Sequence, residues 1–334
     1  MSGVSRLARV AARAGAGTLA RSWRRATRAP GRAIVLMYHR VSDEPDYLGM
    51  AVAPGVFRRQ LEVLRRRARV APLLDLVRRL SGGAPLEHDL AAITFDDGYR
   101  DNLDVALPIL RSAGVPATVF VSIDFIDGTR LPAGERLRAA CERLWTRRTP
   151  PGAWTGGGAA AAEVRAMLAT PGALDAVARL RQTLKPLADG GEAVMTALDA
   201  MAADGTPGTS PMLDWDGVRA LAAAGVEIGS HAMSHGILAR MDHADAAHEI
   251  RASKVRLDAE LGRPVVGFAF PNGRRGDHLP VHGVALREAG YVYACTAETG
   301  INRPGCDAYQ LARIGVGNDP VDLLDLKLAL GRAA

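Results

Sequence analysis

The hydrophobic residues of this chain gather in short continuous runs that alternate with segments of helical period. Residues 33–38 and 90–95 are apolar at almost every position, as strands are when both of their faces are covered. Similar runs occupy residues 116–123, 226–229, 265–270 and 291–296, and a shorter one surrounds residue 314. The pattern therefore predicts a series of buried strands.

The segments between these runs repeat apolar residues every three or four positions, which is typical of helices. Phe57, Leu61 and Leu64 form one such set, and residues 102–113 form another, which ends at Gly114, a residue that favours a left-handed cap. Further helices are expected up to residue 80 and at 215–224, 242–261, 278–289 and 321–330. Strands that alternate with helices form parallel sheets. About seven such units predict an α/β fold, an irregular (β/α)7 barrel of the TIM-like kind.

Residues 127–211 interrupt this alternation. Glycine and proline separate several Ala-, Leu- and Met-rich segments of helical period, and no strand is evident. We interpret the stretch as a helical insertion in a barrel domain of residues 33–334. Two roles are open for it: a cap over an active site, or helical packing without a catalytic part.

Two adjacent carboxylates, Asp96 and Asp97, end the second apolar run and precede Gly98. One interpretation is a turn, because Asp tolerates left-handed backbone and Gly adopts positive φ without steric cost. The other is a reactive site. No Lys or Arg lies nearby before Arg100, so the two charges would repel unless a cation, a proton or hydrogen bonds separate their roles.

A histidine pair, His231 and His235, follows the strand expected at residues 226–229. Two imidazoles with three residues between them can converge on one cation, and two His with one carboxylate are a common open zinc ligand set. The histidine pair alone is weak evidence. Together with the strand-end carboxylates it indicates a metal site with its own general base.

Active sites of α/β barrels lie at the carboxyl ends of the strands. Several polar motifs of this chain follow separate predicted strands: His39, the Asp96 and Asp97 pair, the His231 and His235 pair, and residues 271–273. Unrelated turns would have no reason to share one end of a barrel. We therefore expect these motifs to converge on one rim.

These motifs resemble those of the polysaccharide deacetylases of the NodB-homology type, carbohydrate esterase family 4. The resemblance rests on TFDDG at residues 94–98, on SHAMSH at 230–235 and, more loosely, on FAFPNG at 268–273, and it covers roughly residues 33–316. It implies a hydrolase that removes N-acetyl groups from a sugar in a polysaccharide, an oligosaccharide or a lipid-linked glycan.

The resemblance also implies roles for individual residues. Asp96 would be the general base, and Asp97, His231 and His235 would hold a divalent metal, with zinc favoured over cobalt or nickel. Such a metal lowers the pKa of water and polarises a carbonyl group. The substrate-binding loop would consist of Pro271, Asn272 and Gly273, with the backbone N–H of Asn272 directed to the oxyanion.

The chain departs from the family pattern at two places. Many relatives have an Arg where this chain has Ala269, and that Arg orients the catalytic Asp; Arg274 or Arg275 either substitutes for it or lies in a solvated loop. The His that serves as general acid is also missing, since residues 311–315, LARIG, lie at its place. His39 is the candidate donor at the substrate-binding rim, and a structural His bonded to backbone is the alternative.

A second histidine pair, His278 and His282, has the same three-residue gap on a predicted helix. Only the single Asp277 accompanies it, and no strand-end carboxylate pair lies beside it. We therefore favour a structural role for this pair.

The formal net charge of +6 comes from the N-terminus, because residues 1–32 contain eight arginines and no acid, which leaves −2 for the remainder. A charge confined to one tail does not indicate a nucleic-acid partner. The leader is either disordered, in peripheral contact with anionic lipid, or a targeting segment. No secretory apolar region precedes Arg32, and no later run approaches the roughly 18 residues of a membrane span. We expect a cytoplasmic protein, and membrane contact through the leader is one of the alternatives left open.

Two alternatives to N-deacetylation remain open. The same site could cleave O-acetyl esters of glycans, since both reactions attack an acyl carbonyl. A barrel that binds carbohydrate without turnover would explain the missing acid and the absent Arg at Ala269. The presence of Asp96, which is not needed to bind metal, favours an enzyme. The sugar and the oligomeric state are left open by the sequence.

Overall fold

The computed structural model describes residues 30–44, 49–158, 160–184, 191–203 and 210–331, together with residues 15, 18, 19 and 22. These residues form two compact units. One unit contains the sheet and consists of the described residues up to Asp43, of Met50–Arg130 and of the described residues from Met212 onward. The other unit is helical and consists of the described residues of Leu131–Pro211 and of Glu44–Gly49. The basic leader lies almost entirely outside the described residues, so its expected character stays a prediction.

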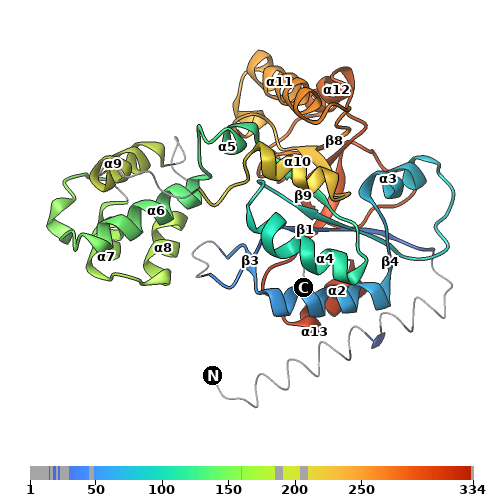
Figure 1. The fold of residues 1–334 in the computed structure, drawn as a ribbon, viewed down its shortest axis with the longest axis horizontal. Helices are drawn as coiled ribbons and strands as arrows, with labels where there is room; N and C mark the ends of the chain where they lie inside the picture. Colours follow the sequence, from blue (N-terminus) through green and yellow to red (C-terminus); the bar gives the residue numbers. More distant parts are fainter. Residues whose placement is uncertain are drawn as a thin grey trace. The chain divides into compact units, whose positions relative to one another are not determined.

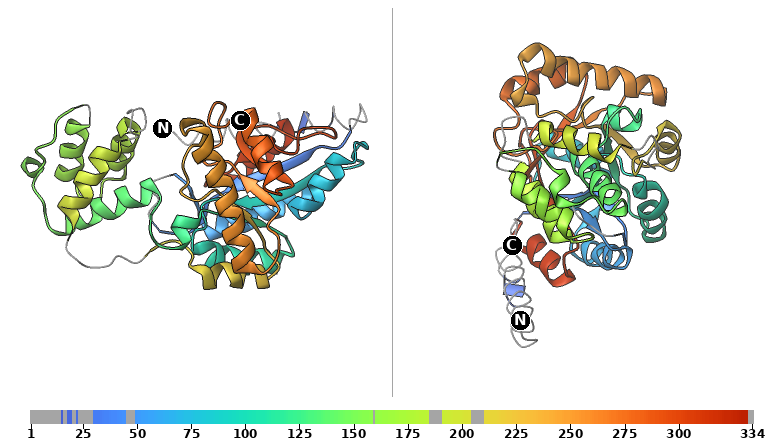
Figure 2. Two further views of the ribbon diagram at one scale, coloured as in Figure 1. Left: turned by 90° about the horizontal axis from the view of Figure 1, so that it is seen from above. Right: turned by 90° about the vertical axis from the view of Figure 1, so that its left-hand side faces the viewer.

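The sheet closes into a seven-stranded parallel barrel (Figures 1 and 2). Its strands are β1 (Ala33–Tyr38), β5 (Leu90–Phe95), β6 (Thr118–Val121), β7 (Glu227–Ser230), β8 (Gly267–Ala269), β9 (Tyr293–Thr299) and β10 (Leu311–Gly315). They neighbour one another in chain order, and β1 pairs with both β5 and β10. The expected irregular (β/α)7 barrel is thus confirmed. A short strand β4 (Arg69–Val70) extends the sheet beside β5, and β2 (Arg40–Val41) pairs with β3 (Ala51–Val52) outside it.

Helices surround the barrel in both views of Figure 2. They are α2 (Pro54–Arg67), α3 (Leu73–Ser81), α4 (Leu107–Ala113), α10 (Trp215–Ala223), α11 (His243–Leu261), α12 (Pro280–Glu288) and α13 (Val321–Leu330). Local sequence explains several of their ends. The carboxylates of Asp214 and Asp242 cap α10 and α11 by accepting backbone N–H groups, and Gly114 and Gly262 end α4 and α11 in the left-handed conformation.

One helix begins differently from the expectation. Residues Asn102–Ala106 form a π-helical turn before α4, where the sequence predicts one α-helix over 102–113. Pro108 has no N–H to donate into the helical ladder, and the Leu107 N–H bonds to the Asn102 carbonyl five residues back.

The interior of the barrel is filled by large side chains that face small ones. A methyl group added to Gly229 would lie 2.3 Å from the Phe120 ring, and one added to Gly267 would lie 2.3 Å from the Tyr293 hydroxyl. Helix α3 contributes Leu76 to the same apolar cluster. The barrel is therefore a packed core, and chemistry must take place at its end rather than in a channel.

The helical unit has a core of its own. Its helices α6 (Ala133–Thr146), α7 (Ala161–Ala169), α8 (Leu174–Leu184) and α9 (Glu192–Ala202) bury an apolar cluster that includes Leu144, Val164 and Leu198. These helices lie within the insertion expected at residues 127–211. Among the described helices, none is both long enough and apolar enough to cross a bilayer.

Residues 31 and 32, expected at the end of the leader, bond to the barrel unit. The Gly31 N–H bonds to the Leu86 carbonyl, and the buried Arg32 forms an ion pair of 2.6 Å with Asp89 and a hydrogen bond with the Ala329 carbonyl. Arg32 therefore joins the start of β1 to the end of α13, and its charge has a structural partner.

Candidate active site

Asp96 and Asp97 lie at the carboxyl end of β5 and are both buried. Asp97 has a φ of 74° and Gly98 one of 86°, so the chain makes a sharp left-handed turn after the strand. A side chain at Gly98 would also meet Val121 at 3.0 Å. The turn interpretation is confirmed, and the turn directs the two carboxylates to different partners, as the site interpretation requires.

Asp97 lies beside the two histidines of the loop after β7. Its Oδ1 atom is 3.2 Å from Nε2 of His235 and 3.6 Å from Nε2 of His231. Within the described residues, these three side chains are the only group of three or more His, Cys, Asp or Glu residues whose potential ligand atoms come together. The structure therefore brings together the three residues for which the sequence predicts metal binding.

The protonation of His231 follows from its surroundings. Its Nδ1 atom lies 2.7 Å from the Ala269 carbonyl oxygen, which can only accept, so Nδ1 carries the proton. Burial lowers the pKa of His231 to about 4, which keeps the ring neutral near pH 7. Its Nε2 atom consequently presents a lone pair toward Asp97.

The Asp97 carboxylate is ionised. Burial would raise its pKa, but His235, followed by His39 and His231, holds the pKa below the ordinary value. Its Oδ1 atom is buried and accepts no hydrogen bond of good geometry from the described residues. An ionised oxygen and an imidazole lone pair that face each other need a cation between them, so these donors fit a divalent metal. The hydrogen bond from His231 to the Ala269 carbonyl is the outer contact that metal-binding histidines usually have.

Asp96 has a different partner, Arg313 of β10. The guanidinium binds both carboxylate oxygens, with Nη1 to Oδ1 and Nη2 to Oδ2 each at 2.7 Å. Its remaining donors bind the Thr296 carbonyl at 2.7 Å and the Thr94 hydroxyl at 3.2 Å. Burial alone would raise the pKa of Asp96, but Arg313 lowers it below the ordinary value, so Asp96 is an ionised base.

Of the two alternatives for Arg274 and Arg275, the structure supports the solvated loop, and Arg313 takes the place of the absent Arg at position 269. Arg274 and Arg275 are exposed and form no ion pair with the described residues, whereas Arg313 is buried. The signal was available as a lone Arg in the apolar run around residue 314. Its partner could not be inferred, because Asp96 lies 217 residues away in the chain.

The loop after β8 contains Pro271, Asn272 and Gly273. Asn272 has a φ of 58°, and its side-chain amide donates to the Asp277 carboxylate. Gly273 bonds through its carbonyl to the Ala297 N–H at 2.7 Å, and a side chain on it would meet that nitrogen at 2.8 Å. The loop is thus held against β9, and the Asn272 side chain has a structural partner.

His39 follows β1 at the same end of the barrel. Strands β1 and β5 pair in register from Ala33 with Leu90 to Tyr38 with Phe95, so His39 lies next to Asp96 in the sheet. After burial and the closer partners, its charge also lowers the pKa of both carboxylates. Its carbonyl accepts a bond from Asn102, but no described residue forms a hydrogen bond with its ring.

The second histidine pair has structural surroundings. The Nδ1 atom of His282 accepts the Leu279 N–H and caps α12, and the His278 ring stacks on Phe270 with centroids 4.6 Å apart. The two rings do not form a metal-type cluster with the described carboxylates. The structural interpretation of this pair is supported.

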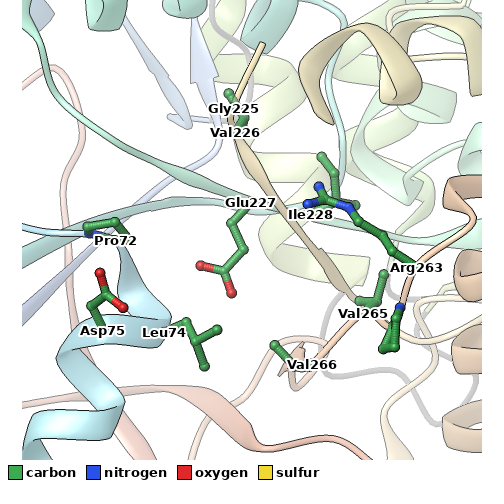
Figure 3. A pocket seen from close by; sticks show the side chains of 11 residues that line it. Pro72, Leu74, Asp75, Gly225, Val226, Glu227, Ile228, Arg263, Val265 and Val266 are labelled. Carbon is green, nitrogen blue, oxygen red and sulfur yellow. The ribbon is translucent and has the colours of Figure 1, made fainter. Parts of the chain in front are cut away.

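A cavity of about 300 Å³ lies at the opposite end of the barrel, beside the first residues of β7 (Figure 3). Glu227 extends into it, but its carboxylate accepts bonds from the hydroxyls of Tyr293 and Thr118 and from the Leu74 N–H. Because these partners satisfy the buried carboxylate, we assign Glu227 to closing the barrel rather than to catalysis.

Comparisons with known proteins agree with this geometry. The family model described as polysaccharide deacetylase matches residues 83–170 and 178–294. No curated protein is significantly similar in sequence. Among solved structures, the deacetylase PplD of Streptococcus pyogenes, in complex with acetate, is 16% identical with a TM-score of 0.59, and the match covers 92% of this chain and 100% of PplD.

Two further solved structures have the same fold. IcaB from Ammonifex degensii is 19% identical with a TM-score of 0.55, over 91% of this chain and 98% of IcaB. A de-N-acetylase from Aggregatibacter actinomycetemcomitans is 16% identical with a TM-score of 0.55, over 86% of this chain and 96% of that protein.

The metal centre predicts a simple stoichiometry. Purified protein should bind about one zinc, cobalt or nickel ion per chain, and His231→Ala should bind none, because an open site needs all three ligands. His282→Ala is the matched control, since it removes a buried histidine that caps α12 and should retain the ion. Elemental analysis after reconstitution measures this. Wild-type protein without metal, or equal loss in both variants, would contradict the assignment.

The ion pair inside the barrel predicts a pH-dependent stability. Arg313→Met leaves Asp96 buried without a partner, which should lower the free energy of unfolding by ~3–5 kcal/mol at neutral pH. In wild-type protein the lowered pKa of Asp96 stabilises the fold above the ordinary carboxyl pKa, and this contribution is lost as pH falls through the lowered pKa. In Arg313→Met, burial raises the pKa of Asp96, so Asp96 takes up a proton as the pH falls. The difference in the free energy of unfolding between the two proteins should therefore become smaller in acid.

Urea unfolding of the two proteins from pH 8 down to about pH 4, near the ordinary carboxyl pKa, tests this expectation. Arg313→Lys is a further variant that keeps the charge without the two-pronged contact. A difference in stability that does not change with pH would show that Asp96 is not the group left unpaired.

Proposed function

Since this chain belongs to the polysaccharide deacetylase family, we propose that it is a metal-dependent hydrolase that removes N-acetyl groups from a glycan. One observation carries the proposal: the two adjacent carboxylates of β5 have separate partners. Asp96 is held by Arg313, and Asp97 faces His231 and His235. A site that only bound metal would need the second arrangement and not the first.

Asp96 can act as the base because Arg313 holds it in place and keeps it ionised, against the effect of burial, which alone would raise its pKa. Each carboxylate oxygen of Asp96 accepts one hydrogen bond from the guanidinium. A carboxylate oxygen has a second lone pair, and that lone pair can accept the proton of water. General-base assistance of this kind is worth ~10²–10⁴ in rate. A divalent ion held by Asp97, His231 and His235 would supply Lewis acidity that lowers the pKa of the attacking water and polarises the acetyl carbonyl.

The loop after β8 would stabilise the developing oxyanion. The Asn272 side chain is held by Asp277, and no described residue accepts a hydrogen bond from the Asn272 N–H. A preorganised backbone donor contributes on the order of 3 kcal/mol to such a transition state. Pro271 and Gly273 act by holding the loop, since Gly273 is bonded to β9.

His39 is our candidate for the proton donor to the departing amine. The family's general-acid histidine is expected in the segment of β10 that contains Arg313. Strand β1 lies between β5 and β10, so His39 at the end of β1 can take the place of that histidine. Its ring has no hydrogen-bond partner among the described residues, which leaves it available to substrate.

The alternative of a binding protein without turnover loses one of its two arguments. It rested on the absent Arg at Ala269 and on the missing acid, and Arg313 supplies the first from β10. PplD, whose fold this chain shares, was solved in complex with acetate, the product that a deacetylase releases. We therefore favour N-deacetylation of an acetylated carbohydrate, with O-deacetylation as the closest competing reaction.

Removing the base should separate catalysis from metal binding. Asp96→Asn should lower the rate of acetate release from N-acetylhexosamine oligosaccharides by ~10²–10⁴, because the amide cannot accept the water proton. Metal content should stay at the wild-type level, whereas Asp97→Asn should lose it. Acetate release quantified by an enzyme-coupled assay measures this. Undiminished turnover in Asp96→Asn would overturn the proposed mechanism.

The proton-donor assignment predicts a different outcome for His39. His39→Ala should lose turnover on amides while metal content is retained. Acetyl esters should be affected much less, because an alkoxide departs with less need of a proton than an amine. Parallel assays on an N-acetylated and an O-acetylated sugar provide the comparison. Unchanged amide turnover in His39→Ala would remove this residue from the mechanism.

A further inference from the structure

The loop that carries both histidines has an uncommon backbone. Ala232 has a φ of 66° and His235 one of 60°, a region that residues with a side chain seldom adopt. These two residues bend the chain between β7 and α11 so that both imidazoles face Asp97. Some contact must hold the loop in this shape, because local sequence does not favour it.

Glu249, on the second turn of α11, makes that contact. Its Oε2 atom accepts the backbone N–H groups of Met233, at 2.8 Å, and of Ser234, at 2.9 Å. Its Oε1 atom accepts the Ser234 hydroxyl at 2.7 Å. One carboxylate thus receives three hydrogen bonds from the two residues that lie between Ala232 and His235. Bonds to an ionised acceptor are the stronger kind.

The opposite side of the loop is held by the segment that leads into α5 (Ile123–Ile126). The Ser122 hydroxyl donates to the His231 carbonyl at 2.8 Å, and the Asp124 N–H donates to the Met233 carbonyl at 2.9 Å. The Phe125 ring stacks on His235, with centroids 5.4 Å apart. The carbonyl groups of the loop therefore face one element, and its N–H groups face Glu249.

We propose that Glu249 is a positioning residue of the metal centre. Its hydrogen bonds go to Met233 and Ser234 rather than to the three side chains expected to hold the metal. It acts by keeping the backbone between the two histidines in the left-handed shape that aims both Nε2 atoms at Asp97. The proposal rests on the metal centre of the proposed function. It adds a residue that lies 14 positions beyond His235 and outside the motifs recognised in the sequence.

The chemistry of a carboxylate explains why Glu suits this position. Two N–H groups and one hydroxyl converge on it, and a carboxylate has acceptor sites for all three without a donor that would oppose them. Without it, the Met233 and Ser234 N–H groups would turn toward water, and the loop could relax toward ordinary φ values. The two Nε2 atoms would then diverge, and an ion would have to reorganise the loop before binding.

The test is the zinc affinity of the full chain, measured by competition with a chromophoric chelator. Glu249→Ala should weaken zinc binding by ~10- to 100-fold, the usual effect of removing an outer contact of a metal site. Glu249→Gln keeps an acceptor for the two N–H groups and should recover most of that affinity. Glu260→Gln is the matched control on the same helix, since Glu260 bonds only to arginines, Arg219 and Arg256, and should bind zinc as wild type does.

Thermal unfolding of the metal-free proteins accompanies the measurement, because a purely structural role would lower stability without a selective effect on zinc. Glu249→Asp, which keeps the charge but has a shorter reach, serves if Glu249→Ala does not fold, and it should bind zinc at least several-fold more weakly. Wild-type affinity in Glu249→Ala or Glu249→Asp overturns the proposal. So does an equal loss in Glu249→Gln and Glu249→Ala, since charge rather than position would then be responsible.

These outcomes are independent of the reaction. If the chain binds zinc and releases no acetate from any acetylated sugar, the proposed function fails and the role of Glu249 is still decided by the affinities. If it releases acetate and the Glu249 variants bind zinc as wild type does, only the present inference fails.

Discussion

The ion pair of Arg313 with Asp96 inside the end of the barrel is the interaction on which the candidate site depends. Two adjacent carboxylates cannot both ionise in a buried turn unless each has its own compensation. The guanidinium supplies it for Asp96, and it is itself held by the Thr296 carbonyl and the Thr94 hydroxyl. Because Arg313 compensates the charge of Asp96, Asp97 can face the histidines instead.

The geometry of the barrel makes this pair possible. β10 lies beside β1, and β1 lies beside β5, so Arg313 can reach Asp96 only because the sheet closes. The pairing of β9 with β10 moves from Leu311 with Cys295 to Arg313 with Thr299, an irregularity at the level of the arginine. The Thr296 carbonyl in that stretch accepts from Arg313. Irregular pairing next to an active site commonly redirects a side chain in this way.

Backbone strain is concentrated at the same rim. Four of the described non-glycine residues with positive φ, namely Asp97, Ala232, His235 and Asn272, lie in the loops that follow β5, β7 and β8. The histidine loop is held by Glu249 of α11 and Phe125 of α5, and Asn272 is held by Asp277 of its own loop. A packed barrel supplies the rigid base against which such loops can be kept in unfavourable conformations.

The sequence by itself determined most of the elements and the candidate metal ligands, because these depend on local pattern. Strands β1 and β5 and helix α13 have the bounds that their apolar runs predict, and Asp97, His231 and His235 are recognisable from their spacing and their place after strands. The tertiary structure decided the rest. Arg313 and Glu249 act on residues that they meet only through barrel closure and helix packing, and no local pattern encodes a partner 217 residues away. Long-range pairing of charge is a property of the folded chain, and it converts a predicted ligand set into a site with an oriented base.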